Sequence, residues 1–193
     1  MMLDDSLSWK QHIAHVSSKL SNGCWALSQF RKCSNPQMVK KVYLSLLYPH
    51  IQYCMTSWGC AAKSVLDFLI KLQKRMVRIM TFSHNKASSM PLFHKLNLLK
   101  LNDVFKLEIA KVMHNIENSE HLPDYISNNF ERVDWTHDHN TRHANKRNNV
   151  LSKIRTETGK KSIVYWGPKI WQEVPPDINS KPLLLFKKNT PII

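Results

Sequence analysis

The sequence predicts a mainly α-helical protein, with a helical N-terminal part and a loop-rich C-terminal part that holds at most a short β element. Apolar residues recur at steps of three and four in four segments, which is the spacing of one helix face. Only four glycines occur among 193 residues, which disfavours a turn-rich β fold. Hydrophobic residues make up 42% of the chain, enough to build a core.

The first predicted helix begins after Ser8 and ends near Arg31. The stretch from Ser8 to Gln11 matches a capping box, in which a serine and a glutamine satisfy amides at a helix start. Asn22-Gly23 is a candidate break, because glycine is a poor helix former. The apolar residues at helical spacing are Trp9, Ile13, Val16, Leu20, Cys24 and Leu27.

A second helix is predicted to begin with Asn35 as N-cap and Pro36 as its first residue, a common arrangement at helix starts. Pro49 should kink or end this helix, because proline removes a backbone hydrogen bond. The apolar residues between Ile51 and Trp58 then predict a continued helical segment. The predicted buried side consists of Val39, Val42, Tyr43, Leu46 and Leu47.

A third helix, amphipathic and strongly basic, is predicted for residues 66–80, with Ser64 as its N-cap. At 100° per residue, its four bases fall within about 100° of arc. They are Lys71, Lys74, Arg75 and Arg78. The opposite, apolar side contains Leu66, Leu69, Ile70, Met76, Val77 and Met80.

Two interpretations of these four bases stay open. The first is an ordinary solvated surface. The second is a face that meets a polyanion, since like charges spaced three and four residues apart repel by a few tenths of a kcal/mol per pair. A purely solvating face would more often mix charges of both signs.

The rest of the chain is predicted to contain a loop, a fourth helix, a polar arm and a short strand-like stretch. Residues 82–91 read as a loop, and a fourth helix starts at Asn102 or Asp103. Residues 128–161 are polar and basic and predict a loop or partly disordered arm. Within 162–171, short strand character is stopped by Gly167-Pro168. The fourth helix should bury Phe105, Ile109, Val112, Met113 and Ile116, and the strand character comes from Ile163, Val164 and Tyr165.

These elements predict a division of the chain into three parts. Residues 1–120 form a helical region, residues 121–161 form a basic loop or linker rich in His and Asn, and residues 162–193 form a small C-terminal segment.

The positive charge points to the class of partner. The net charge is +14, and residues 6–102 carry fourteen bases with a single acid, Asp67. Residues 139–161 form a second, shorter basic block. Nucleic acid is the commonest polyanion, so we expect it as the partner, while a basic surface without a special partner is the alternative. A membrane is not expected, because the sequence has no run of about 18 apolar residues and no signal-peptide pattern.

Candidate catalytic and metal-binding residues are few. His137, His139 and His143 are spaced closely enough for a metal site, but the neighbouring Arg142 would repel a cation, so a solvated or RNA-facing loop is favoured. Asp4-Asp5 could belong to a two-metal site, but the pair has no third carboxylate nearby and reads as the polar lead-in to the first helix. We therefore expect no metal and no cofactor.

The sequence also lacks the short motifs of catalysis. It has no glycine-rich phosphate loop, no nucleophile elbow and no H-E-x-x-H, so the chain is not expected to be an enzyme by its own residues. Its four cysteines form no C-x-x-C pair, which argues against a zinc finger or a disulfide framework. A reduced, intracellular compartment is expected, either nucleus or cytoplasm.

An ordered set of short stretches resembles a known family. The stretches are LDDSLSWKQHI at 3–13, VYLSLLYPHIQYCMTSWG at 42–59, LQKRMVRIM at 72–80, PLFHKLNLLKLNDVFKL at 91–107, SIVYWGPKIWQEVP at 162–175 and LFKK at 185–188. In this order they are similar to the region downstream of the palm in reverse transcriptases of non-LTR (LINE-type) retrotransposons. One departure is Val174-Pro175, where Leu-Pro is usual in the family.

The resemblance implies a thumb-like helical bundle that grips the template–primer backbone during reverse transcription. It places the bases of the 66–80 helix on the phosphate-facing side, and Lys40, Lys41 and Arg142 from the two basic blocks complete the expected nucleic-acid-binding set. The family's catalytic motif, an aromatic residue followed by any residue and two aspartates, is missing, because Asp4-Asp5 follows Met2-Leu3. The fingers and palm would lie upstream of Met1.

Two functions follow as expectations. The first is a non-catalytic, sequence-independent nucleic-acid-binding fragment of an RNA-directed DNA polymerase, with RNA, DNA or a hybrid, and the missing palm and fingers, as partners. The alternative is a degenerate relic of the element that acts as a protein-interaction or structural module without binding nucleic acid.

Overall fold

The computed structural model describes residues 1–118, 128–130, 150 and 153–175. The chain divides into two compact units, residues 1–104 and residues 105–193, and each is considered by itself. The described residues are mainly helical and contain no strand, so the predicted fold class is confirmed. The predicted domain boundaries at residues 120 and 161 stay predictions.

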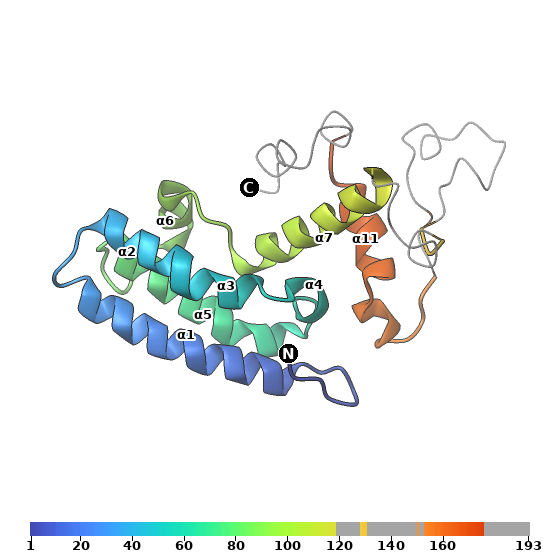
Figure 1. Ribbon diagram of the computed structural model, residues 1–193, viewed down its shortest axis with the longest axis horizontal. Coiled ribbons are helices and arrows are strands. Elements are labelled where there is room, and N and C mark those ends of the chain that lie inside the picture. Colours follow the sequence, from blue (N-terminus) through green and yellow to red (C-terminus); the bar gives the residue numbers. More distant parts are fainter. Residues whose placement is uncertain (119–127, 131–149, 151–152, 176–193) are drawn as a thin grey trace. The chain divides into compact units, whose positions relative to one another are not determined.

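Two long helices form the base of the first unit. Helix α1 (Lys10–Phe30) and helix α5 (Lys63–Met80) pack side by side (Figure 1). They run parallel and in register: the Arg31 guanidinium lies 4.6 Å from the centre of the Phe82 ring, and Ser17 and Phe68 line one common groove. In each pair the residue on or after α5 follows its partner on or after α1 by 51 positions (68 − 17 and 82 − 31), so the two helices keep one register along their length.

The start of α1 differs from the predicted capping box. Trp9 occupies the N-cap position in a left-handed conformation, with φ of 62°, and no side chain caps the helix. Instead, the Asp4 carboxylate accepts hydrogen bonds from the amides of Ser8 and Trp9 at 3.0 and 3.1 Å and from the hydroxyls of Ser6 and Ser8. The Ser8 hydroxyl contributes most to holding the pKa of Asp4 far below its usual range. Asp4 therefore organises the lead-in to α1, as a polar residue was expected to do there.

The candidate break at Asn22-Gly23 is not present, because α1 continues through both residues. Gly23 instead allows a close approach to Leu47: a Cβ placed on Gly23 would overlap the methyl groups of the Leu47 side chain. The glycine is thus explained by packing between helices rather than by a turn.

The second predicted helix forms in pieces, namely α2 (Pro36–Val42), the π-helical turn η1 (Tyr43–Leu47), α3 (Tyr48–Gln52) and α4 (Met55–Trp58). Asn35 is the N-cap, and its side-chain oxygen accepts from the Met38 amide at 2.9 Å, which confirms the predicted start. The wide turn η1 lies just before Pro49, where the Tyr48 amide donates to the Tyr43 carbonyl.

The expected continuous segment after Pro49 is interrupted. Cys54 takes a left-handed conformation with φ of 52°, so α3 and α4 are separate. The predicted burial of Leu46 is also wrong, since this side chain is 63% exposed. The wide turn leaves the buried residues at steps of four, and these are Val39, Tyr43, Leu47 and Ile51.

The basic helix α5 forms as predicted, except that Ala62 rather than Ser64 is its N-cap. Its buried side includes five of the six predicted apolar residues and also Leu72, Gln73 and Ile79. The loop that follows is shorter than predicted, because helix α6 (Ser89–Leu96) begins before Pro91. Proline is tolerated there, since amides of the first helical turn have no partner within the helix.

The buried side chain of Gln73 fixes the connection between α6 and α7 (Leu101–Asn118). Its Nε2 donates to the Leu99 carbonyl at 2.9 Å, and its Oε1 accepts from the Leu101 amide at 3.0 Å. Helix α7 therefore starts one residue before the predicted Asn102, at a backbone amide that Gln73 satisfies.

In the second unit, the predicted strand is wrong. Ile163 to Trp171 form helix α11, with the Ser162 hydroxyl accepting from the Val164 amide at 3.2 Å. The preceding segment Gly159–Lys161 is a short 3-10 helix, η2. Pro168 lies inside α11 rather than ending it.

Gly167 explains why the helical form of 163–171 is stabilised. A Cβ at this position would lie 2.6 Å from Sδ of Met113 on α7 and 3.2 Å from the Phe130 ring. The Phe105 and Trp166 rings also meet edge to face, 5.7 Å between centres. This close packing against α7 overrides the strand preference of the β-branched residues. The predicted apolar side of α7 is confirmed for Phe105, Ile109 and Met113, while Val112 and Ile116 are only half-buried.

Candidate nucleic-acid interface

The four bases of α5 form what we name the basic face: Lys71, Lys74, Arg75 and Arg78. The first three side chains are exposed and Arg78 is half-buried. Among the described residues, none of the four has an ion-pair partner. The single acid of the helix, Asp67, is also exposed and forms no ion pair there. The face therefore presents positive charge that no carboxylate of the described residues neutralises.

Two of the predicted binding residues have structural roles. Arg78 donates through Nε to the Ala87 carbonyl at 2.8 Å and so holds the loop between α5 and α6. Lys40 donates through Nζ to the Leu96 carbonyl at 2.6 Å, at the last residue of α6. A cation at this position also complements the negative end of the helix. Lys41 is exposed on α2 and keeps its full donor capacity within the described residues.

Arg75 occupies the edge of the basic face nearest α1. Burial raises the pKa of the Cys24 thiol on α1, and the positive charge of Arg75 partly opposes this shift. Arg75 is separated from Cys24 by the same offset along the chain as Phe68 from Ser17 and Phe82 from Arg31, so the two residues are level on the parallel helices. Arg75 therefore adds positive charge to the junction of α1 and α5.

A hollow lies on each flank of the basic face. The α1–α5 groove has a volume of about 460 Å³ and is lined by Lys10, Ile13, Ala14, Ser17, Ser18, Ser21, Val65 and Phe68. The pocket on the α6 flank measures about 230 Å³ and is lined by Ile70, Gln73, Lys74, Ser89, Met90, Phe93, Lys100, Leu101 and Asn102. Lys74 and Lys100 thus extend the positive surface into this pocket.

Phe68 is a residue that the sequence analysis missed. Its ring is 53% exposed and lines the α1–α5 groove. This differs from the general pattern of α5, in which apolar side chains are buried and basic side chains are exposed. The signal was present in the sequence, because Phe68 precedes Lys71 by three residues and Arg75 by seven. At helical spacing these three residues share one face.

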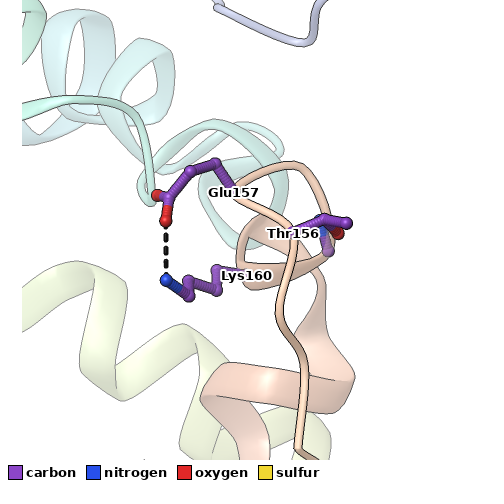
Figure 2. Close-up of polar contacts among 4 residues, drawn as sticks. Thr156, Glu157 and Lys160 are labelled. Carbon is purple, nitrogen blue, oxygen red and sulfur yellow. Dashed lines mark hydrogen bonds and ion pairs between the residues drawn. The ribbon is translucent and has the colours of Figure 1, made fainter.

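The second basic block contains a neutralised lysine. The Lys160 ammonium lies 2.6 Å from the Glu157 carboxylate, and the dashed line in Figure 2 marks this ion pair. In the same turn, the Thr156 hydroxyl accepts from the Gly159 amide. Glu157 is the one acid of residues 139–161, so its charge offsets one of the bases there. The predicted binding residue Arg142 and the histidines His137, His139 and His143 lie outside the described residues.

Other kinds of site find little support in the part of the chain that the structure describes. It contains no group of three His, Cys, Asp or Glu side chains that could hold a metal ion, and none of the four cysteines is in a disulfide. Nor does any of its helices have the length and apolar character needed to span a bilayer. No protein-family model, curated protein or solved structure matches the chain. The basic face is therefore the candidate site on its geometry and charge.

Proposed function

We propose that this protein is a non-catalytic nucleic-acid-binding module that contacts the phosphate backbone without reading sequence. The observation that carries the proposal is the exposed, uncompensated charge of Lys71, Lys74 and Arg75 on one helix face. Ammonium and guanidinium groups bind phosphates of any sequence, because the phosphate positions do not depend on the bases. Binding of this kind releases counterions and is steeply salt-dependent.

The resemblance described above supports a narrower form of this proposal. The chain then corresponds to the thumb-like region downstream of the catalytic palm in a non-LTR retrotransposon reverse transcriptase. Its partners are the backbones of RNA, DNA or an RNA–DNA hybrid, together with the palm and fingers of the same element, inside the nucleus or cytoplasm.

The salt dependence of binding tests the proposal. The test variant carries Lys71→Gln, Lys74→Gln and Arg75→Gln, which keep helix propensity and leave the apolar side intact. Arg78 is left unchanged because it holds Ala87. If two or three of the changed residues contact phosphate, the slope of log K against log salt should fall by about two units in magnitude for a double-stranded nucleic acid. Fluorescence anisotropy on an RNA–DNA hybrid measures this slope, and circular dichroism reports the fold.

A control variant removes the same charge elsewhere. It carries Lys19→Gln on α1, Lys106→Gln and Lys160→Gln, of which the last two already form ion pairs with Glu173 and Glu157. Its slope should change by clearly less than that of the test variant. Equal slopes in the wild type and the folded test variant would contradict the proposal and leave the basic face as a solvated surface.

A protein-interaction module is the second candidate function. It is favoured by two apolar side chains on the surface of the η1–α3 region, Leu46 at 63% exposed and Tyr53 at 59% exposed. Contiguous exposed apolar patches are typical of surfaces that meet another protein, so this candidate requires that the two side chains belong to one patch. This candidate would gain support if the wild-type chain showed no salt-dependent binding to nucleic acid.

A further inference from the structure

Two exposed aromatic side chains occur on the two helices that form the α1–α5 groove. Phe68 on α5 is 53% exposed and Trp25 on α1 is 67% exposed. A single exposed aromatic residue needs no explanation, but aromatic rings beside a basic stripe are the combination used to bind unpaired nucleotides.

On α5, the Phe68 ring and two basic side chains lie on the same edge of the groove. Phe68, Lys71 and Arg75 follow one another at helical spacing and fall within about 60° of arc. Phe68 lines the groove directly, and the register of the two helices places Arg75 level with Cys24 of α1. The edge of α5 nearest α1 therefore carries a stacking surface and positive charge together.

On α1, Trp25 continues the row of residues that lines the groove. Ala14, Ser18 and Ser21 belong to the lining, and Trp25 follows Ser21 by one helical turn. All four positions fall within about 60° of arc. Trp25 does not itself line the groove, but helical spacing places it on the same side of α1, one turn beyond Ser21.

The parallel register of the two helices sets the order along the track. Ser17 is level with Phe68, and Arg31, further along α1, is level with Phe82. Trp25 comes between Ser17 and Arg31, and Arg75 comes between Phe68 and Phe82. One end of the track thus has Phe68, the other has Trp25, and serine hydroxyls lie between them.

We infer that the α1–α5 groove binds a single-stranded stretch of nucleic acid, with bases stacked on Phe68 and Trp25 and phosphates held by Lys71 and Arg75. This inference rests on the proposed function and adds the form of the strand. In a duplex, each base face is covered by its neighbour, so the two rings have nothing to stack on. An unpaired strand exposes those faces, and every base has one, so the preference is for strand form and not for sequence.

The experiment compares a mixed-sequence single strand with a duplex of the same sequence by fluorescence anisotropy. Stacking contributes about 1–3 kcal/mol per base, so Trp25→Ala and Phe68→Ala should each weaken single-strand binding by about 5- to 150-fold. Duplex affinity and the salt slope should stay as in the wild type, because neither change alters charge.

Matched controls use exposed apolar residues outside the groove. Tyr53→Ala and Leu46→Ala remove side chains of similar exposure from the η1–α3 region and should leave single-strand affinity unchanged. A second pair, Trp25→Leu and Phe68→Leu, keeps apolar side chains on the helices but removes the rings. These leucine variants should lose affinity nearly as the alanine variants do, with circular dichroism unchanged.

Two results would overturn the inference. One is unchanged single-strand affinity in the folded Trp25 and Phe68 variants. The other is an equal loss on single strand and duplex, because that would remove the selectivity for unpaired bases. Either result can occur while the Lys71, Lys74 and Arg75 variant still loses its salt slope, in which case the proposed function stands and only the stacking track fails.

Discussion

Gly23 in the middle of α1 packs directly against Leu47 of the π-helical turn η1. A Cβ at position 23 would overlap the Leu47 methyl groups, and the Leu47 side chain is itself buried, so little room exists for it to move. The missing side chain of Gly23 is therefore what allows α1 and η1 to approach this closely.

Gly23→Ala should destabilise the protein although alanine is the better helix former. Overpacking costs about 1–3 kcal/mol, against a helix-propensity gain of about 1 kcal/mol. A net loss of up to about 2 kcal/mol is expected, measured as the free energy of unfolding in urea.

The same change in a Leu47→Ala background should have the opposite sign. Once the leucine methyl groups are gone, only the propensity gain of about 1 kcal/mol remains. The coupling free energy of the double-mutant cycle should then exceed about 1 kcal/mol, as for residues in direct contact. Additive effects of the two substitutions would show that this contact does not decide the role of Gly23.

Gln73→Leu should destabilise the protein strongly. The side chain satisfies the Leu99 carbonyl and the Leu101 amide, and each buried backbone group left without a partner costs about 1–3 kcal/mol. A loss of about 2–5 kcal/mol is expected in urea denaturation. The exposed Gln11→Leu on α1 serves as control and should change the free energy of unfolding by less than about 0.5 kcal/mol. Similar losses for both variants would contradict the role given to Gln73.

His12 should make the protein sensitive to mild acid. The ring is 4% exposed, packs edge to face on Trp9 and Trp58, and has no hydrogen-bond partner among the described residues. Burial, followed by the charges of the N-terminus and His15, lowers the pKa of His12 below its usual value. The unfolded chain therefore protonates His12 more readily than the folded chain does. The free energy of unfolding keeps its full contribution from neutral His12 above about pH 6.5 and loses it as the pH falls below that value.

Thermal unfolding at about pH 7.5 and about pH 5.5 measures this effect. The melting temperature of the wild type should fall between the two pH values, and His12→Leu should reduce that fall. His50→Gln on α3 changes an exposed histidine that is not among the groups acting on His12, and this control should behave nearly as the wild type. An undiminished fall in the His12 variant would assign the acid sensitivity to other groups.

The purified chain should show no polymerase activity. In the reverse transcriptases that the chain resembles, the paired aspartates that hold Mg²⁺ follow an aromatic residue. Here Asp4-Asp5 follows Met2-Leu3, and the Asp4 carboxylate accepts hydrogen bonds from the Ser8 and Trp9 amides. Primer extension on an RNA template, with Mg²⁺ and nucleotides, gives the measurement, and a mock preparation gives the background. Template-dependent extension above that background would contradict the proposal of a non-catalytic module.

The sequence by itself determined the features that depend on neighbouring residues. Helical periodicity predicted α1, α5 and α7, and the start of α2 followed from Asn35-Pro36, because a cap and a proline act within one turn. The basic face was also predictable, since the spacing of Lys71, Lys74 and Arg75 places them on one side of any regular helix.

Only the tertiary structure decided the features that depend on residues far apart in the chain. The segment 163–171 is helical because Gly167 packs against Met113, although its β-branched residues alone favour a strand. Gly23 is a packing residue because Leu47 lies against it.

The same reason separates binding candidates from structural bases. Lys40 and Lys41 are indistinguishable in the sequence, but the fold brings the Leu96 carbonyl within 2.6 Å of the Lys40 ammonium and leaves Lys41 exposed. Likewise, Arg78 belongs to the basic face by periodicity, yet the loop after α5 returns the Ala87 carbonyl to its Nε. Local sequence placed the charges, and chain folding decided which of them acquire a partner, because a hydrogen bond depends on distance in space and not on distance along the chain.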